Sequence, residues 1–165
     1  MLAIAYATTP EQIDVTRDLI REYTDSVCAM ADDRFSAAAF AGLDHELANL
    51  PGAYAPPDGR MLLAELDGNP VGCIALRRFD ATTGEVKRLY VRPGHRGQHV
   101  GERLVAALLT AAREAGYQRL VLDSHTMMTH AHALYRAAGF RDMAPPHGFP
   151  DELRSVVLFM QMDLR

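Results

Sequence analysis

The sequence predicts a mixed α/β fold, with a mainly antiparallel central sheet, flanking helices and one parallel strand–helix–strand unit. Three observations lead to this prediction. Short apolar runs of strand length alternate with longer segments of helical periodicity. Two of the runs flank strong turn residues, as in a hairpin. Two others, between Val86 and Leu122, are separated by one long helix and imply a parallel pair with a right-handed crossover.

The N-terminal half is expected to contain a strand, two helices and a hairpin. Leu2 to Thr8 has strand length, and Thr9-Pro10-Glu11-Gln12 combines a capping hydroxyl, a proline at the first helical position and a glutamine for a capping box. A second helix is expected where Phe40, Leu43, Leu47 and Leu50 recur at helical spacing, before Pro51-Gly52. A shaped loop then runs to Gly59, and Met61–Leu66 and Val71–Leu76 form the hairpin around Asp67-Gly68-Asn69-Pro70.

The C-terminal half is expected to continue with strands and helices in alternation. A strand covers Val86 to Val91, after a Thr83-Gly84 turn and before Pro93-Gly94. A long helix follows from Val100 to Gly116, then a buried strand at Leu120–Leu122. Another helix, with an apolar stripe through Ala131, Leu134, Tyr135 and Ala138, stops at Gly139, and Ser155–Met162 forms the last strand.

Length and composition are those of one ordinary globular domain. The chain has 165 residues, of which 48% are hydrophobic and 23% charged, and no linker or repeat divides residues 1–165. The net charge of -4 argues against nucleic acid as a partner. Cys28 and Cys73 are too few for a disulfide scaffold and are expected to be buried. No apolar run reaches the ~18 residues of a membrane span, and the N-terminus lacks the basic start of a secretory signal, so a cytoplasmic protein without membrane partners is expected.

The segment from Arg92 to Gly101 has the features of an anion-binding turn. It joins a strand to the start of a long helix, where backbone N–H groups lack acceptors and the helix dipole adds positive potential. Residues 86–104 carry a net charge of +4, whereas the rest of the chain carries -8. Phosphate is the ligand that suits such a place. The glycines alone are equally compatible with a tight turn and close helix packing, and the charge contrast favours the anion site.

The phosphate-binding patterns of P-loop NTPases and of Rossmann domains are both absent, because their glycines and lysine do not occur at this turn. Arg96-Gly97-Gln98-His99-Val100-Gly101 instead resembles the acetyl-CoA signature of the GNAT superfamily of N-acetyltransferases, with His99 where the middle glycine usually stands. A second segment, Leu134-Tyr135-Arg136-Ala137-Ala138-Gly139-Phe140, resembles a later motif of that family. The resemblance extends from about Arg60 to Phe140.

This resemblance implies acetyl-CoA as the cofactor and transfer of its acetyl group to a primary amine by direct attack in a ternary complex. The pantetheine arm is then expected beside the strand end at Leu89, Tyr90 and Val91, with the Val91 amide on the thioester carbonyl. The phosphates are expected on Arg96, Gly97, Gln98, His99, Val100 and Gly101. Met128 stands where the family usually has an asparagine, so Thr129 is expected to take over its contact with the cofactor.

The same resemblance assigns Tyr135 as the general acid that protonates the departing thiolate, a role that suits a phenol with a pKa near 10. A carboxylate or a water held by one is expected to take the proton of the amine, and the candidates are Glu85 and Asp123. Glu85 is slightly favoured because its side chain is longer and simple strand alternation places it on the side of Lys87, Leu89 and Val91. Spacing alone is also compatible with packing or turn roles for all three residues.

The sequence is also compatible with other functions. A non-catalytic acyl-CoA-binding regulatory module is compatible with His99 and Met128, and a modifier of aminoacylated RNA fits the family but not the acidic chain. No metal site is expected, since His130 and His132 point to different faces of a helix, and His45-Glu46-Leu47-Ala48-Asn49 lacks the second histidine of a zinc protease motif. The acceptor is expected to be a small molecule, an amino acid or a peptide, and the C-terminal strand can pair in a homodimer.

Overall fold

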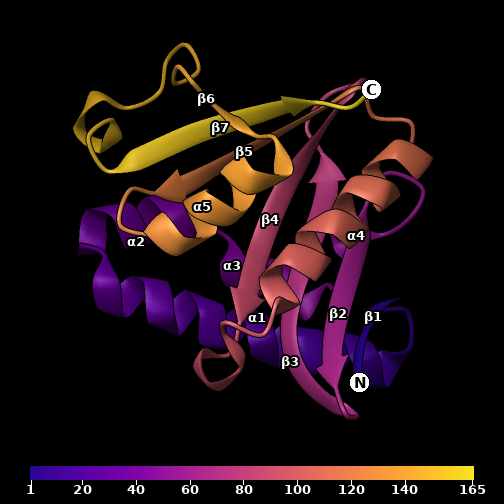
Figure 1. Ribbon diagram of the computed structural model, residues 1–165. Coiled ribbons are helices and arrows are strands. Elements are labelled where there is room, and N and C mark those ends of the chain that lie inside the picture. The colour runs from indigo at the N-terminus through magenta and orange to yellow at the C-terminus, as the bar shows by residue number, and fades with distance from the viewer.

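A computed structural model describes residues 1–165 and contains one seven-stranded sheet with helices on both faces (Figure 1). The strands are β1 (Leu2–Tyr6), β2 (Arg60–Leu66), β3 (Asn69–Arg78), β4 (Thr83–Val91), β5 (Arg119–His125), β6 (Arg141–Met143) and β7 (Val157–Asp163). The helices are α1 (Pro10–Met30), α2 (Asp33–Ala39), α3 (Leu43–Ala48), α4 (Val100–Glu114) and α5 (Thr129–Ala138). Short 3₁₀ helices cover Gly52–Tyr54, Pro93–His95 and Asp151–Leu153.

The strand order is β1-β2-β3-β4-β5-β7-β6, and every neighbouring pair is antiparallel except β4 and β5. The helix α4 connects these two parallel strands, as the crossover rule requires. The predicted fold class is therefore confirmed, including the parallel unit and the hairpin of β2 and β3. The capping box is also present, because the Thr9 hydroxyl accepts from the Gln12 amide and the Gln12 side chain accepts from the Thr9 amide.

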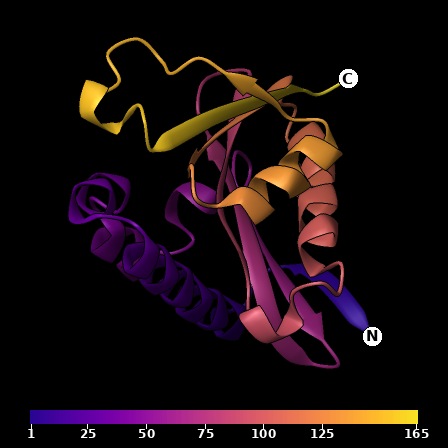
Figure 2. The ribbon, with the colours of Figure 1, turned by 60° about the vertical axis from the view of Figure 1, so that its left-hand side comes forward.

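The sheet, which Figure 2 shows as a layer between α1 and α4, separates two apolar clusters. On the α4 face, Leu104 and Leu108 pack against buried residues of β2, β3 and β5. On the α1 face, Leu19 and Ile20 pack against Met61 and Leu63 of β2. These two layers fix the sheet between α1 and α4. None of the helices combines the length and the apolar composition needed to cross a bilayer.

The expected single helix through Phe40, Leu43, Leu47 and Leu50 is wrong. Phe40 is the C-cap of α2, and Gly42 adopts a left-handed φ of 79° before α3 begins. This conformation is available to glycine at little cost, so the helical spacing is interrupted by a turn rather than continued. The chain thus forms two short helices between α1 and the loop at Pro51.

The segment Thr83-Gly84, expected as a turn, is instead the start of β4. The turn lies just before it, where the Asp80 carboxylate accepts hydrogen bonds from the amides of Thr82 and Thr83 at 2.9 and 2.8 Å.

The last strand, β7, lies between β5 and the three-residue β6, which the sequence did not predict. The strand β6 pairs with Phe159, Met160 and Gln161 and so occupies this part of the outer edge of β7.

Candidate functional site

The parallel strands β4 and β5 separate soon after they begin to pair. Their ladder contains only Thr83–Arg119, Gly84–Leu120 and Glu85–Val121. The pairing of β4 with β3 also shifts, since Cys73 lies opposite Tyr90 and Ala75 opposite Lys87. This irregularity surrounds Arg88, a non-glycine residue with a left-handed φ of 61°. The second half of β4 therefore diverges from β5 and leaves a cleft between the two strands.

The irregularity at Arg88 is a β-bulge with one extra residue in β4. After the bulge, each side chain of β4 faces the side of the sheet opposite to the one that simple alternation predicts. Val86 and Leu89 both belong to the cluster on the α4 face, although they are three residues apart, and Tyr90 belongs to the cluster on the α1 face. Glu85, adjacent to Val86, consequently lies on the face opposite Leu89 and Val91. The expectation that simple alternation places Glu85 on their side is wrong, because the extra residue at the bulge shifts the alternation by one position.

Backbone amides of β4 face this cleft. The Arg92 amide donates to the Val71 carbonyl of β3 at 2.8 Å. Because successive N–H groups of a strand point to opposite edges, the amides of Val91 and Leu89 point away from β3 and toward the cleft. The divergence of β5 deprives these donors of a strand partner.

A cavity of about 310 Å³ opens at the end of the cleft, between β4, the start of α4, the start of α5 and α1. Eight of the ten residues predicted to hold a cofactor line it, namely Leu89, Tyr90, Val91, Arg96, Gly97, Val100, Gly101 and Thr129. The other two, Gln98 and His99, do not. One wall of the cavity was not predicted from the sequence: α1 contributes Tyr23, Ser26, Val27 and Met30. Tyr23 and Val27 follow Ile20 at helical spacing along this helix, which was the available signal.

The turn before α4 is shaped by residues with left-handed backbone. Gly97 has a φ of 76°, and His99, the N-cap of α4, has a φ of 60° with no capping hydrogen bond from its side chain. A Cβ atom on Gly101 would lie 2.7 Å from Leu134 Cδ1, so glycine permits close approach of α5. The Arg96 Nε donates to the Val91 carbonyl at 3.1 Å, which ties the turn to the end of β4. The buried Nδ1 of His95 has no hydrogen-bond partner.

A second, smaller cavity of about 40 Å³ lies beside the first and shares Tyr23, Val27, Leu89, Met128 and Ala131 with it. Its further lining includes Phe35 and Phe40 from the α2 segment, Lys87 and Arg88 from β4, Asp123, Ser124 and His125 from β5, and Tyr135 from α5. The structure thus brings Tyr135 and Asp123 together. Glu85 lines neither cavity.

Tyr135 is 6% exposed and packs edge-on against Phe140, with ring centroids 5.5 Å apart. None of the hydrogen bonds within the chain involves its hydroxyl group. Burial raises the pKa of Tyr135 far above its ordinary value, and the neighbouring Tyr23 and Asp123 raise it further. The phenol therefore holds its proton at any physiological pH.

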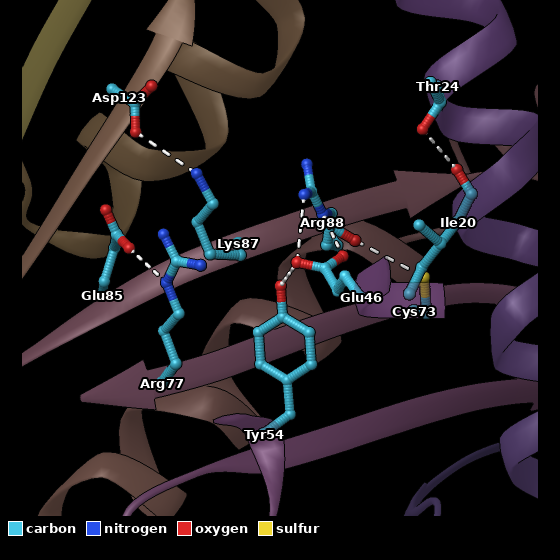
Figure 3. Close-up of polar contacts among 10 residues, drawn as sticks. All are labelled: Ile20, Thr24, Glu46, Tyr54, Cys73, Arg77, Glu85, Lys87, Arg88 and Asp123. Atoms are coloured by element: carbon cyan, nitrogen blue, oxygen red, sulfur yellow. Dashed lines mark hydrogen bonds and ion pairs between the residues drawn. The ribbon is translucent and has the colours of Figure 1, made fainter. Parts of the chain in front are cut away.

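Both candidate carboxylates are paired with cations, as Figure 3 shows. The Glu85 Oε1 accepts from Arg77 Nε at 2.6 Å, and the Glu85 side chain is 13% exposed. The Asp123 Oδ1 lies 3.5 Å from Lys87 Nζ, and the Asp123 side chain is 36% exposed. Asp123 is therefore the more accessible carboxylate, and the only one of the two beside Tyr135.

Arg88 joins the bulge of β4 to the segment after α2 (Figure 3). Its Nε and Nη2 atoms donate to the two carboxylate oxygens of Glu46 at 3.1 and 3.2 Å, and the Tyr54 hydroxyl donates to Glu46 Oε1 at 2.8 Å. The guanidinium lies 5.5 Å from the centre of the Phe40 ring. This network was not predicted; it holds α3 and the 3₁₀ helix at Tyr54 against the sheet.

Comparison with known proteins identifies the fold and the family. Residues 18–140 match the family model described as the acetyltransferase (GNAT) family. An uncharacterised N-acetyltransferase of Schizosaccharomyces pombe is 32% identical over 151 residues, which cover 90% of this chain and 88% of that protein. An IAA acetyltransferase of Azospirillum brasilense is 37% identical over 135 residues, which cover 80% and 85% of the two chains.

Solved structures share the fold over the whole chain. A GNAT-family acetyltransferase from Staphylococcus aureus superposes with a TM-score of 0.77 at 21% identity, and the match covers 100% of both chains. An N-acetyltransferase from Thermoplasma acidophilum, solved in complex with coenzyme A, has a TM-score of 0.75 at 16% identity and 99% coverage of both.

Proposed function

The chain belongs to the acetyltransferase (GNAT) family, and we propose that it is a single-domain enzyme that transfers an acetyl group from acetyl-CoA to a primary amine by direct attack in a ternary complex. The observation that carries this proposal is the cleft between β4 and β5. Amides of β4 without a strand partner face this cleft. The turn with Gly97 at the start of α4 lines the larger cavity, and Tyr135, whose hydroxyl makes no hydrogen bond, lines the smaller one.

The larger cavity suits coenzyme A. Its orphaned His95 Nδ1 is a buried polar atom that a ligand can engage, and the left-handed Gly97 opens the turn toward the N-terminus of α4. Arg96, Gly97, Val100 and Gly101 would hold the phosphates, the amides of Leu89 and Val91 would pair with the pantetheine arm, and Thr129 would contact it from α5. The complex of the T. acidophilum relative with coenzyme A supports this ligand. Acetyl-CoA supplies the activated acyl group and a thiolate as leaving group.

The chain's own groups fit the needs of acyl transfer. The Val91 amide, which faces the cleft, donates to the carbonyl oxygen on which negative charge develops. The Tyr135 hydroxyl keeps a proton for the departing sulfur, since burial raises its pKa. Asp123, rather than Glu85, is the carboxylate placed to attract the ammonium form of the acceptor. The smaller cavity is lined by Asp123 and Tyr135, and it would give the acceptor amine its approach from the side of α1 and α2.

Isothermal calorimetry with acetyl-CoA and with free CoA tests the cofactor assignment. Micromolar binding is expected for the unmodified chain and is expected to be lost in the double variant Arg96→Ala, Gly97→Ala. Arg113→Ala, at the other end of α4, is the matched control and should bind normally. If the unmodified chain binds neither compound, the proposed function is wrong.

Release of free thiol from acetyl-CoA in the presence of a panel of small amines, amino acids and peptides then tests catalysis. Amine-dependent thiol release is the expected result. Binding of CoA without acetyl transfer to any amine would favour a non-catalytic acyl-CoA-binding module instead.

A further inference from the structure

The acceptor amine must lose a proton, and most groups that line the smaller cavity are unsuited to take it. Lys87 and Arg88 are cations. Asp123 lies 3.5 Å from Lys87, so protonation of its carboxylate would disrupt an ion pair. The same objection applies to Glu85, which in addition lines neither cavity.

The other titratable groups of the smaller cavity also fail. Burial raises the pKa of Tyr23 to about 12 and that of Tyr135 further, so both phenols stay protonated. The Nδ1 of His125 accepts a hydrogen bond from the Met127 amide at 3.1 Å. The neutral ring therefore carries its hydrogen on Nε2 and has no lone pair to offer.

Ser124 is the remaining polar side chain of this cavity, and it has a base behind it. Its Oγ lies 3.0 Å from Nε2 of His132, which extends from α5, and 3.6 Å from Met128 Sδ. His132 is 4% exposed and lines neither cavity. The imidazole is thus screened from solvent and reaches the cavity through one hydroxyl group.

The surroundings of His132 favour a neutral ring. Burial lowers the pKa of His132 most strongly, and Arg136, on the same helix, lowers it further. Asp142 of β6 and a backbone hydrogen bond with His125 of β5 act in the opposite direction without compensating. In the neutral ring with its hydrogen on Nδ1, Nε2 is the acceptor nitrogen, and it lies 3.0 Å from the Ser124 hydroxyl oxygen.

We propose that Ser124 and His132 form a proton relay that deprotonates the acceptor amine. As the amine attacks, its N–H bond breaks and the proton moves to Ser124 Oγ, while the hydroxyl proton of Ser124 moves to His132 Nε2. The lone pair of the amine nitrogen forms the new C–N bond as the C–S bond of the thioester breaks, the electron pair of the broken N–H bond stays on the nitrogen, and His132 becomes an imidazolium. After the product leaves, the imidazolium returns its proton through Ser124 to water, and Tyr135, which gave its proton to the departing sulfur, regains one from water. The relay rests on the proposed acetyltransferase function; Ser124 contacts the substrate and His132 acts through it.

The pH dependence of kcat/KM for the amine tests the relay. The unmodified enzyme should lose activity toward low pH with an apparent pKa below 6.5, as His132 becomes protonated. Ser124→Ala and His132→Gln should each lower kcat at least tenfold and remove this acidic limb. Glutamine retains a polar contact with Ser124 but cannot take a proton. Ser124→Thr keeps the hydroxyl group and should restore most of the rate, and His45→Gln, an exposed histidine on α3, should behave as the unmodified enzyme.

Calorimetry and thermal unfolding of the same variants separate the relay from a structural role. The expected result is an unchanged Kd for CoA and an unchanged Tm in Ser124→Ala, together with the loss of kcat. Retention of kcat within twofold, or of the acidic limb in His132→Gln, would overturn the relay. A loss of rate that follows a loss of CoA affinity or of folding would overturn it as well. If the unmodified chain acetylates no amine, the proposed function itself fails and the relay with it.

Discussion

Tyr135 combines a packed ring with a hydroxyl that no group of the chain engages. Tyr135→Phe removes that oxygen without breaking a hydrogen bond and keeps the contact with Phe140. We therefore expect a loss of kcat of about 100-fold, the range of a missing general acid, with unfolding free energy changed by less than about 0.5 kcal/mol. Steady-state thiol release and urea denaturation measure the two quantities.

The control for this substitution is Tyr6→Phe, on β1, which should leave kcat unchanged although the Tyr6 hydroxyl donates to Glu114 at 3.0 Å. Full activity of Tyr135→Phe across the pH range, under conditions where departure of the thiolate limits the rate, would refute the general-acid role.

His99 is a non-glycine residue in left-handed conformation at the start of α4, with a φ of 60°. Its imidazole contacts the Glu102 carboxylate, but both side chains are exposed and the contact contributes little. His99→Gly and His99→Ala both remove this contact, whereas only glycine relieves the backbone strain. The glycine variant should be more stable than the alanine variant by about 1 kcal/mol, as measured by urea denaturation. Equal stability of the two variants would show that the turn is not strained at this position.

At the scale of single residues, the sequence motifs identified the turn and Tyr135, and the structure places both at one cleft. The sequence slightly favoured Glu85 over Asp123, because the bulge at Arg88, which shifts the strand alternation by one residue, was not predicted. Nothing in the local sequence marks such a bulge, since Arg88 is neither glycine nor a turn residue. The pairing of Ser124 with His132, which was considered only as a metal ligand, was not predicted for a related reason: a serine and a histidine eight positions apart meet only when β5 and α5 are packed.

At the scale of elements, α3 is attached to the sheet by the ion pair between Glu46 and Arg88. The Arg88 and Glu46 side chains are 7% and 18% exposed, so the pair is largely desolvated. Glu46→Gln leaves the buried guanidinium without a counter-charge, which should lower the unfolding free energy by about 3 kcal/mol. Urea denaturation followed by circular dichroism measures the loss.

The matched control is Asp58→Asn, which removes the partner of Arg78 from an ion pair whose side chains are 47% and 54% exposed. That change should cost less than about 1 kcal/mol. A similar small effect in Glu46→Gln would mean that the Arg88 network does not hold α3 to the sheet.

At the scale of elements, helices and strands with strong end signals were predicted well. The Thr9 capping box and the Asp67-Gly68 turn are examples, because their chemistry is local. The division of one expected helix into α2 and α3 was missed, since Phe40, Leu43 and Leu47 keep helical spacing across Gly42. The strand β6 was missed because three residues carry no periodicity, and their pairing with β7 is a tertiary contact.

At the scale of the whole molecule, the central sheet has two parts, and few residue pairs connect them. The strands β1–β4 and the strands β5, β7 and β6 meet through a parallel ladder of three residue pairs, and α4 bridges them. The crossover that creates this arrangement was predictable from the order of apolar runs. The extent of the divergence was not, because it depends on the bulge and on where the ladder stops.

A ligand in the larger cavity contacts β4 of the first part and the start of α5, the helix that follows β5 of the second part, because its walls come from α1, β4, α4 and α5. Coenzyme A at 100 times its Kd should raise the unfolding free energy by about 2.7 kcal/mol if it binds only the folded chain. For a chain of this size, that corresponds to an increase in Tm of about 5–10 °C. Thermal unfolding with CoA, with adenosine alone and with the Arg96→Ala, Gly97→Ala variant checks the expectation. If adenosine alone gives the full shift, or if the double variant retains it, the ligand does not bridge the cleft and the two parts of the sheet are held by the chain alone.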